Sequence, residues 1–188
     1  MIIMQYVKIP RERIAVLIGE KGSVKRDIER RTNTKINIED TSVSIDSIDD
    51  NSMNELTARD IALAIGRGFR PEIALRLLNE EFTLEILYLR DFANTQRAIK
   101  RIKSRVIGEN GRAKGTIENL TNTYISIYGK TIAIIGSYDD VPVAKEAITR
   151  LIEGYRHASV YRFLEKTRSR RRHSPWNLEE ILRQENFA

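Results

Sequence analysis

Two short segments flanked by glycines carry residue types that suggest a chemistry. Residues 19–22 read Gly-Glu-Lys-Gly, and residues 108–111 read Gly-Glu-Asn-Gly. Glycine has no Cβ, so it can adopt a positive φ and lets another molecule approach the main chain closely. If a helix begins directly after such a loop, its free N–H groups and the positive end of its dipole attract phosphate. The two segments are therefore candidate phosphate-binding loops.

Charged side chains near the loops influence how well each loop could bind an anion. Both loops place a glutamate after the first glycine, and a carboxylate repels phosphate. Basic residues around each loop offset this repulsion, and they are denser around the second loop, which we expect to be the stronger site. The candidate binding residues are Gly19, Glu20, Lys21, Gly22, Lys25 and Arg26 for the first loop, and Lys103, Arg105, Gly108, Glu109, Asn110, Gly111, Arg112 and Lys114 for the second.

The two loops belong to an internal repeat. A shift of 89 residues superimposes residues 19–22 on 108–111 and, without a gap, residues 32–38 (TNTKINI) on residues 121–127 (TNTYISI). Chance similarity would give scattered matches, whereas this register holds over some thirty positions. We infer two copies of one module.

Hydrophobic periodicity predicts the elements of the first copy. Residues 4–9 alternate as a strand, and apolar residues at helical spacing lie on both sides of the glycine loop. Two alternating strands follow the second helix. Ser52 and Glu55 then form a capping box for a helix that runs to about Phe69. The predicted order is strand, helix, loop, helix, strand, strand, helix.

The second copy repeats this order. The predicted strand 82–89 leads to a helix that ends at the second loop, and another helix follows the loop. The hairpin 124–136 has apolar residues on alternate positions and turns at Gly129–Lys130. Asp139 or Asp140 is expected to cap the last helix.

Two further segments lie outside the copies. The linker has apolar residues at helical spacing and no Gly/Ser run, so we expect a short helix that packs the modules together as one body. In the tail, Val160, Phe163 and Leu164 share one helical face, which either packs back on the modules or docks on a partner. A basic run, 166–173, and a short acidic helical piece, 174–188, follow. The expected domains are 1–70 and 82–154, joined by the linker helix 71–81 and followed by a basic helical tail, 155–188.

A helix–GxxG–helix unit beside a three-stranded sheet resembles the KH domain. Both copies are similar to KH modules of type I, whose order is β-α-α-β-β-α. The resemblance implies an α+β fold with two tandem type I KH domains packed together and a C-terminal helical tail. It also implies that the loops clamp about four nucleotides of single-stranded RNA, while the bases lie across an apolar groove.

Longer segments resemble a narrower family. Residues 64–78, 105–137 and 159–168 are similar, in this order, to archaeal Dim2/Pno1 (partner of Nob1) ribosome-assembly proteins, and the similarity includes linker and tail. It implies a non-enzymatic factor that binds the 3′ end region of (pre-)16S rRNA in the small ribosomal subunit. It also implies a Nob1-type endonuclease as a partner and, in archaeal members, the alpha subunit of translation initiation factor 2 as another.

Composition narrows the class of protein. The 188 residues suit one or two small domains, and a net charge of +6 favours an anionic partner. Cysteine is absent, which excludes disulfides, thiolate catalysis and Cys-based metal sites. No apolar run is long enough to span a bilayer, and the N-terminus does not read as a signal peptide. We therefore expect a cytoplasmic protein without membrane contact.

Catalysis is not expected from these residues. RNA cleavage by general acid and base usually needs paired histidines, and the only two, His157 and His173, both lie near the basic tail. The carboxylates between residues 39 and 50 fall on strand ends and a loop, where they are more often solvated than metal-bound. Neither glycine loop continues as a Walker motif. We expect no catalytic residue, no metal site and no cofactor.

The residues leave two alternatives open. The chain could be a KH-domain RNA-binding protein of another pathway, such as the exosome or the regulation of mRNA and translation. An exosome subunit would be expected to carry another RNA-binding domain before the KH module, and this sequence starts directly in a KH strand. The KH pair could also serve mainly as a protein-docking scaffold, which the glutamate in each loop favours.

Overall fold

The order strand, helix, loop, helix, strand, strand, helix occurs twice in the structure. The structure is a computed structural model that describes residues 5–49 and 51–172, with residue 172 described by its backbone only. The first module contains β1 Gln5–Lys8, α1 Arg11–Ile18, α2 Ser23–Thr32, β2 Thr34–Glu39, β3 Ser42–Ser47 and α3 Ser52–Gly66. The linker forms α4 Pro71–Ala74 and a 3₁₀ turn, Leu75–Leu78. The second module contains β4 Phe82–Tyr88, α5 Gln96–Ile107, α6 Arg112–Thr121, β5 Tyr124–Tyr128, β6 Thr131–Ser137 and α7 Asp140–Glu153, and α8 His157–Arg172 follows it.

Each module has an antiparallel three-stranded sheet with its last strand in the middle. The strand orders are β1-β3-β2 and β4-β6-β5. β2 and β5 therefore each form one edge of a sheet, directly after the helix that follows a glycine loop. The predicted α+β fold built from two copies of one module is confirmed.

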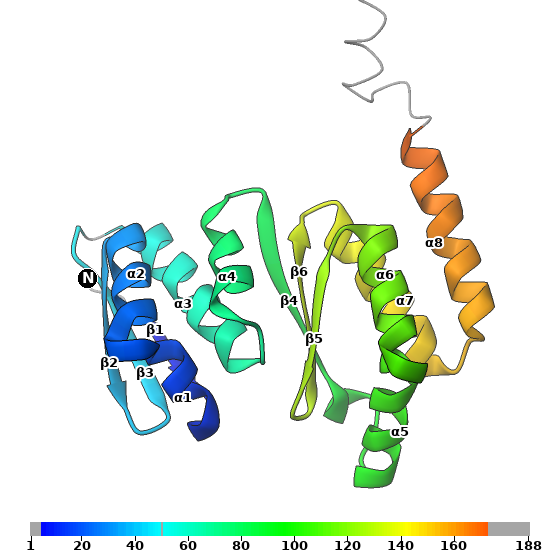
Figure 1. The fold of residues 1–188 in the computed structure, drawn as a ribbon, viewed down its shortest axis with the longest axis horizontal. Coiled ribbons are helices and arrows are strands. Elements are labelled where there is room, and N and C mark those ends of the chain that lie inside the picture. The colour runs from blue at the N-terminus through cyan, green and yellow to red at the C-terminus, as the bar shows by residue number, and fades with distance from the viewer. Residues whose placement is uncertain (1–4, 50, 173–188) are drawn as a thin grey trace, which may run out of the picture.

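The elements stack in layers (Figure 1). The first sheet forms one end of the molecule, followed by its helices, the linker helix α4, the second sheet, the helices α5 to α7, and finally α8. The second sheet therefore lies between the helices of both modules. Its two faces contribute to two different cores.

Burial of β6 follows from this sandwich. Every residue from 131 to 136 is buried, with Ala133 and Ile135 in the core of the first module and Ile132 and Ile134 in the core of the second. The apolar residues noted on alternate positions of this hairpin predict one buried face, whereas β6 is buried on both faces. A strand covered on both faces reads as a continuous apolar run, because neither face has to be polar.

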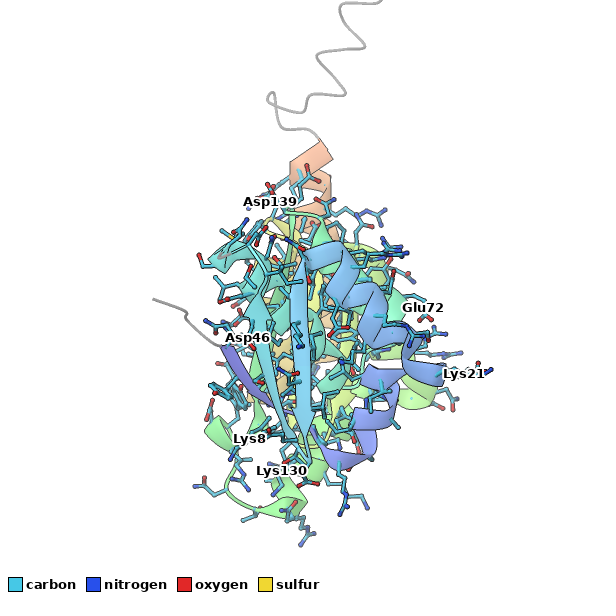
Figure 2. The ribbon with its side chains drawn as sticks, turned by 90° about the vertical axis from the view of Figure 1, so that its left-hand side faces the viewer. Lys8, Lys21, Asp46, Glu72, Lys130 and Asp139 are labelled. Atoms are coloured by element: carbon cyan, nitrogen blue, oxygen red, sulfur yellow. The ribbon has the colours of Figure 1, made fainter. Side chains whose placement is uncertain are left out.

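The first sheet does alternate. Val43 and Ile45 of β3 are buried against the helices, whereas Tyr6, Lys8 and Lys35 on neighbouring strands are exposed. Figure 2 looks onto this open face, where Lys8 and Asp46 are labelled. The two sheets thus share a topology but not an environment.

Polar contacts also join the modules. The Ser126 hydroxyl donates to the Arg67 carbonyl oxygen at 2.8 Å, and the Tyr128 hydroxyl donates to Glu12 Oε1 at 2.5 Å. The bond from Tyr128 lowers the pKa of the Glu12 carboxyl and raises the pKa of the Tyr128 hydroxyl. These contacts tie β5 of the second module to α1 and α3 of the first.

The tail helix packs back on the second module. Val160 and Leu164 of α8 are buried in the second core, and Phe163 is half-buried with the Arg150 guanidinium 3.9 Å from its ring centroid. Of the two alternatives for this apolar face, the structure shows packing on the chain itself. The predicted acidic piece at 174–188 and the last residue of the basic run lie outside the described residues.

Two predicted helix caps are wrong. The N-cap of α3 is Asn51, whose side chain accepts from Met53 N at 3.0 Å, and α3 ends at Gly66 rather than near residue 69. Glu55, the other half of the predicted capping box, is buried and accepts instead from Ser47 N at 2.9 Å.

At the start of α7 a serine replaces the predicted aspartate cap. Asp139 occupies the N-cap position without a side-chain cap, and the Ser137 hydroxyl accepts from Asp140 N at 3.1 Å. Asp140 Oδ1 instead accepts from the Arg171 guanidinium of α8 at 2.6 Å. In both modules, one predicted capping side chain, Glu55 or Asp140, binds a group from a neighbouring element instead.

Candidate nucleic-acid interface

The two glycine loops have the same backbone conformation. In each loop three of the four residues lie at positive φ, the region that glycine tolerates best. The φ angles are 73°, 50° and 79° at Gly19, Lys21 and Gly22, and 73°, 51° and 77° at Gly108, Asn110 and Gly111. The repeat detected in the sequence is therefore a repeat in geometry as well.

The first glycine of each loop is needed for packing inside the protein. A Cβ on Gly19 would lie 2.5 Å from Val24 Cγ2 and 2.8 Å from Val24 N. A Cβ on Gly108 would lie 2.6 Å from Ala113 Cβ and 2.7 Å from Ala113 N. This glycine lets the two helices approach each other across the loop, so it does not itself make room for a ligand.

The second glycine faces more open space. A Cβ on Gly111 would meet no atom within 4 Å, and a Cβ on Gly22 would meet only the Arg26 side chain, at 3.0 Å. Each is the N-cap of the following helix, and neither helix start has a side-chain cap. The first N–H groups of α2 and α6, Ser23 N and Arg112 N, donate to the carbonyl oxygens of Glu20 and Glu109, and no side chain caps the N–H groups behind them. The positive end of each helix dipole faces its loop, which keeps both loops candidate anion sites.

The Thr-Asn-Thr motif fixes how the helix after each loop enters the edge strand. The asparagine is a left-handed C-cap with φ of 50° at Asn33 and 52° at Asn122. The two threonine hydroxyls on either side of it lie 2.8 Å apart in both modules. Because these groups are satisfied internally, the motif has a structural role.

Sequence analysis missed a glutamate in each module. Glu29 Oε1 accepts from Ile36 N at 2.8 Å, and Glu118 Oε1 accepts from Ile125 N at 2.7 Å. Each glutamate thus ties the helix after the loop to the outward edge of the neighbouring strand. The two residues are also 89 positions apart, so the repeat itself was the signal that could have found them.

Most of the predicted basic residues do surround the loops. Lys21, Arg26 and Arg112 are exposed, and Figure 2 shows Lys21 projecting away from the body of the molecule. Lys25 and Lys114 are half-buried, and the Nζ of each lies 3.4 Å from an oxygen of the glutamate described above. Part of their charge is therefore compensated within the protein.

Two predicted binding residues are engaged elsewhere. The Arg105 guanidinium donates to the carbonyl oxygens of Leu151, at 2.8 Å, and Tyr155, so it holds the C-terminus of α7. Lys103 Nζ donates to the Gly129 carbonyl oxygen at 3.1 Å, at the turn between β5 and β6. We therefore remove Arg105 from the candidate site, and the second loop loses part of the charge advantage that the sequence suggested.

A groove of about 400 Å³ lies along the free edge of β5 and extends to Ile107, the residue before the second loop. The second module lines it with Ile107, Lys114, Glu118 and residues 124–127. The linker between the modules closes the opposite side. The positive start of α6 and cations near one end, with apolar surface along the edge strand, can together hold a phosphate and a flat apolar group.

Neither a metal site nor a membrane-spanning helix is found in the part of the chain that the structure describes. Within residues 5–49 and 51–172, no group of three or more His, Cys, Asp or Glu side chains could hold a metal ion. In the same ranges, no helix combines the length and the apolar character that crossing a membrane requires.

Comparisons with known proteins agree with this arrangement. Residues 83–169 match the family described as "Eukaryotic type KH-domain (KH-domain type I)", and residues 4–57 match the family described as "KH domain". The two matches fall on the two modules, and the longer one also includes part of α8.

Whole-chain relatives extend the match. A KH domain-containing protein of Methanocaldococcus jannaschii is 44% identical over 170 residues, which cover 89% of this chain and 75% of that protein. The RNA-binding protein pno1 of Dictyostelium discoideum is 33% identical over 176 residues, covering 87% and 71%. A chain in the crystal structure of the a/eIF2alpha-aDim2p-rRNA complex from Pyrococcus horikoshii is 47% identical, with a TM-score of 0.84 over 90% of this chain and 96% of that one.

The fold and the paired glycine loops define a tandem KH-domain protein of type I. The similarity extends beyond the KH motifs to linker and tail. The chain belongs to the Dim2/Pno1 family of KH-domain proteins.

Proposed function

We propose that this chain is a non-enzymatic RNA-binding protein of small-ribosomal-subunit assembly, acting in the cytoplasm on the 3′ end region of (pre-)16S rRNA. The observation that carries the proposal is the groove along the free edge of β5, which adjoins the uncapped start of α6 at the second loop. A groove of this kind suits an unstacked single strand, because a duplex hides the base faces that an apolar wall would contact.

The second loop is the main phosphate site in this proposal. Its peptide N–H groups at the start of α6, together with Arg112 and Lys114, bind the sugar-phosphate backbone, and the β5 groove accepts a base. Glu109 and Asn110 lie between the two glycines of this loop, and Lys103 lines a neighbouring hollow with Ile107 and Lys130. The first loop, formed by residues 19–22 with Lys25 and Arg26, supplies a second and weaker contact.

The pathway and the partners are proposed from relatives. A chain similar over almost its whole length is present in a complex of a/eIF2alpha, aDim2p and rRNA, which supports rRNA and the alpha subunit of initiation factor 2 as partners here. Several relatives carry the name RNA-binding or pre-rRNA-processing protein pno1, which supports a role in rRNA maturation. A Nob1-type endonuclease is proposed from the family resemblance.

Crosslinking in cells tests the pathway. A tagged copy of the chain would be crosslinked to RNA in its own host, purified, and the bound RNA sequenced. We expect the crosslinks to concentrate at the 3′ end of the small-subunit rRNA and its precursor. Crosslinks spread over mRNAs would contradict the ribosomal role and favour a KH protein of another pathway.

A further inference from the structure

The linker between the modules forms one wall of the β5 groove. Residues 68–70 and Ile73, which come from the end of the first module and the start of α4, line the side opposite the second loop. We propose that Arg70 and Ile73 contact the nucleobase held in this groove, so that the junction between the modules, and not the second module alone, selects the RNA. This inference rests on the proposed function and adds residues that select the base.

The linker main chain is held tightly against β5. Gly68 has φ of +99°, and a Cβ there would lie 2.7 Å from Ser126 Oγ and 2.8 Å from Tyr128 Cβ. The carbonyl oxygen of the preceding residue, Arg67, accepts from that same Ser126 hydroxyl at 2.8 Å. Only a glycine at this position allows the linker to come so close to the edge strand.

Contacts on both sides of Arg70 keep the wall in place. Phe69 is buried in the first core, and its carbonyl oxygen accepts from the Arg13 guanidinium at 2.6 Å. Further along the linker, the Arg76 guanidinium lies 4.9 Å from the centroid of the Tyr124 ring on β5. Because the wall is formed before any ligand arrives, binding need not order it, which favours affinity.

The side chains of this wall suit a base. Arg70 is exposed, and its guanidinium makes no hydrogen bond or ion pair within the described part of the chain. A planar guanidinium can stack on a base or bind a phosphate. Ile73 is half-buried and adds apolar surface facing Ile107 and Ile127 across the groove. A groove with apolar walls and one cation without a protein partner in the described ranges can therefore hold a single unstacked nucleobase.

The first module lacks such a wall in the described ranges. Its edge strand β2 lies at the end of the molecule (Figure 1), and Lys35 and Asn37 on this strand are exposed. The loops alone are nearly superimposable. The linker wall, rather than the loop, is thus the feature that distinguishes the two modules as binding sites.

Substitutions at Arg70 test the inference in the full-length chain. The probe is a labelled single-stranded RNA of about eight randomised nucleotides, used to measure affinity and then to sequence the bound fraction. Arg70→Ala should weaken binding about tenfold and relax the base preference at one position. Arg70→Lys, which keeps the charge but not the planar group, should leave that preference relaxed. Arg97→Ala, an exposed arginine at the far end of α5 from the loop, should change neither property and is the matched control.

The outcomes separate this inference from the proposed function. If the wild-type chain binds the RNA and Arg70→Ala stays within about twofold of it with the same preference, the linker inference is wrong and the proposed function stands. If Arg70→Lys binds with wild-type affinity and base preference, only the charge of Arg70 matters, and the proposed base contact is wrong. If the folded wild-type chain binds no RNA in the pool, both proposals fail.

Discussion

Lys21 and Asn110 stand at equivalent positions of the two loops, with φ of 50° and 51°. Asparagine tolerates this left-handed conformation better than lysine, because its short side chain can hydrogen-bond locally. The fold therefore imposes the same left-handed backbone conformation on a lysine and on an asparagine, although the asparagine adopts it at lower cost. The lysine brings an exposed positive charge into this strained position, where it can attract an anion.

Exchanging the two residues should have opposite effects on stability. We expect Lys21→Asn to raise the free energy of unfolding by about 0.5–1 kcal/mol and Asn110→Lys to lower it by a similar amount. Urea unfolding followed by circular dichroism measures both. Two changes of the same sign would mean that side-chain contacts, and not the backbone, decide the effect.

Asp49 makes stability depend on pH. Hydrogen bonds from the Ser47 hydroxyl and then from the Asn33 side chain lower the pKa of Asp49 to about 2, from an ordinary value of 3.8. The unfolded chain therefore binds this proton more readily, and the stabilisation is lost as the pH falls from about 4 to about 2. In Asp49→Asn, the free energy of unfolding should fall less steeply across this window. A slope equal to that of the wild type would contradict the assignment.

At the scale of elements, the repeat explains what could be predicted. The spacing of glycines and of the Thr-Asn-Thr motif predicted both loops and the order of strands and helices, because these depend on local backbone preferences. The caps at Asn51 and Ser137 were missed, and two of the predicted capping side chains, Glu55 and Asp140, bind groups from other elements instead. Burial of β6 on both faces was missed because it depends on how the two modules pack, which periodicity within one strand does not encode.

The close approach of α5 and α6 gives the two glycines of the second loop different sensitivities. Gly108→Ala would place a Cβ against the Ala113 main chain and also strain the positive φ, which should cost about 2–4 kcal/mol of stability. Gly111→Ala meets open space and should cost only about 1 kcal/mol, from strain alone. Thermal or urea unfolding distinguishes them, and equal losses would contradict the packing role of Gly108.

The basic end of α8 lies away from the second loop. Arg168 and Arg171 line a hollow with Asn122, at the C-terminal end of α6, whereas the loop precedes the N-terminal end of that helix. A helix of 10 residues is about 15 Å long. Truncation after Glu165 should therefore leave the salt dependence of binding to a short RNA unchanged. A decrease of about 0.7 or more in the slope of log affinity against log salt would show that these arginines contact phosphate.

At the scale of the whole molecule, the modules cannot be treated as independent. The second sheet is covered on both faces, the Tyr128 hydroxyl donates to Glu12, and the linker closes the β5 groove. One module thus completes the groove of the other. In our proposal the two similar loops therefore have different tasks, and the second loop holds the RNA strand at this composite groove.

The central claim is that the second loop holds single-stranded RNA, and RNA affinities of the wild type and of one variant beside each loop test it most directly. The affinity of the full-length chain would be measured for a short single-stranded RNA with a 16S 3′-terminal sequence and for the same RNA in a duplex. Arg112→Gln and Ser23→Glu each lower the charge by one unit at equivalent positions, directly after the two loops. We predict a preference of about tenfold or more for the single strand, a loss of about fivefold in Arg112→Gln, and little change in Ser23→Glu. Equal affinity for duplex and single strand, or a larger loss in Ser23→Glu, would contradict the account.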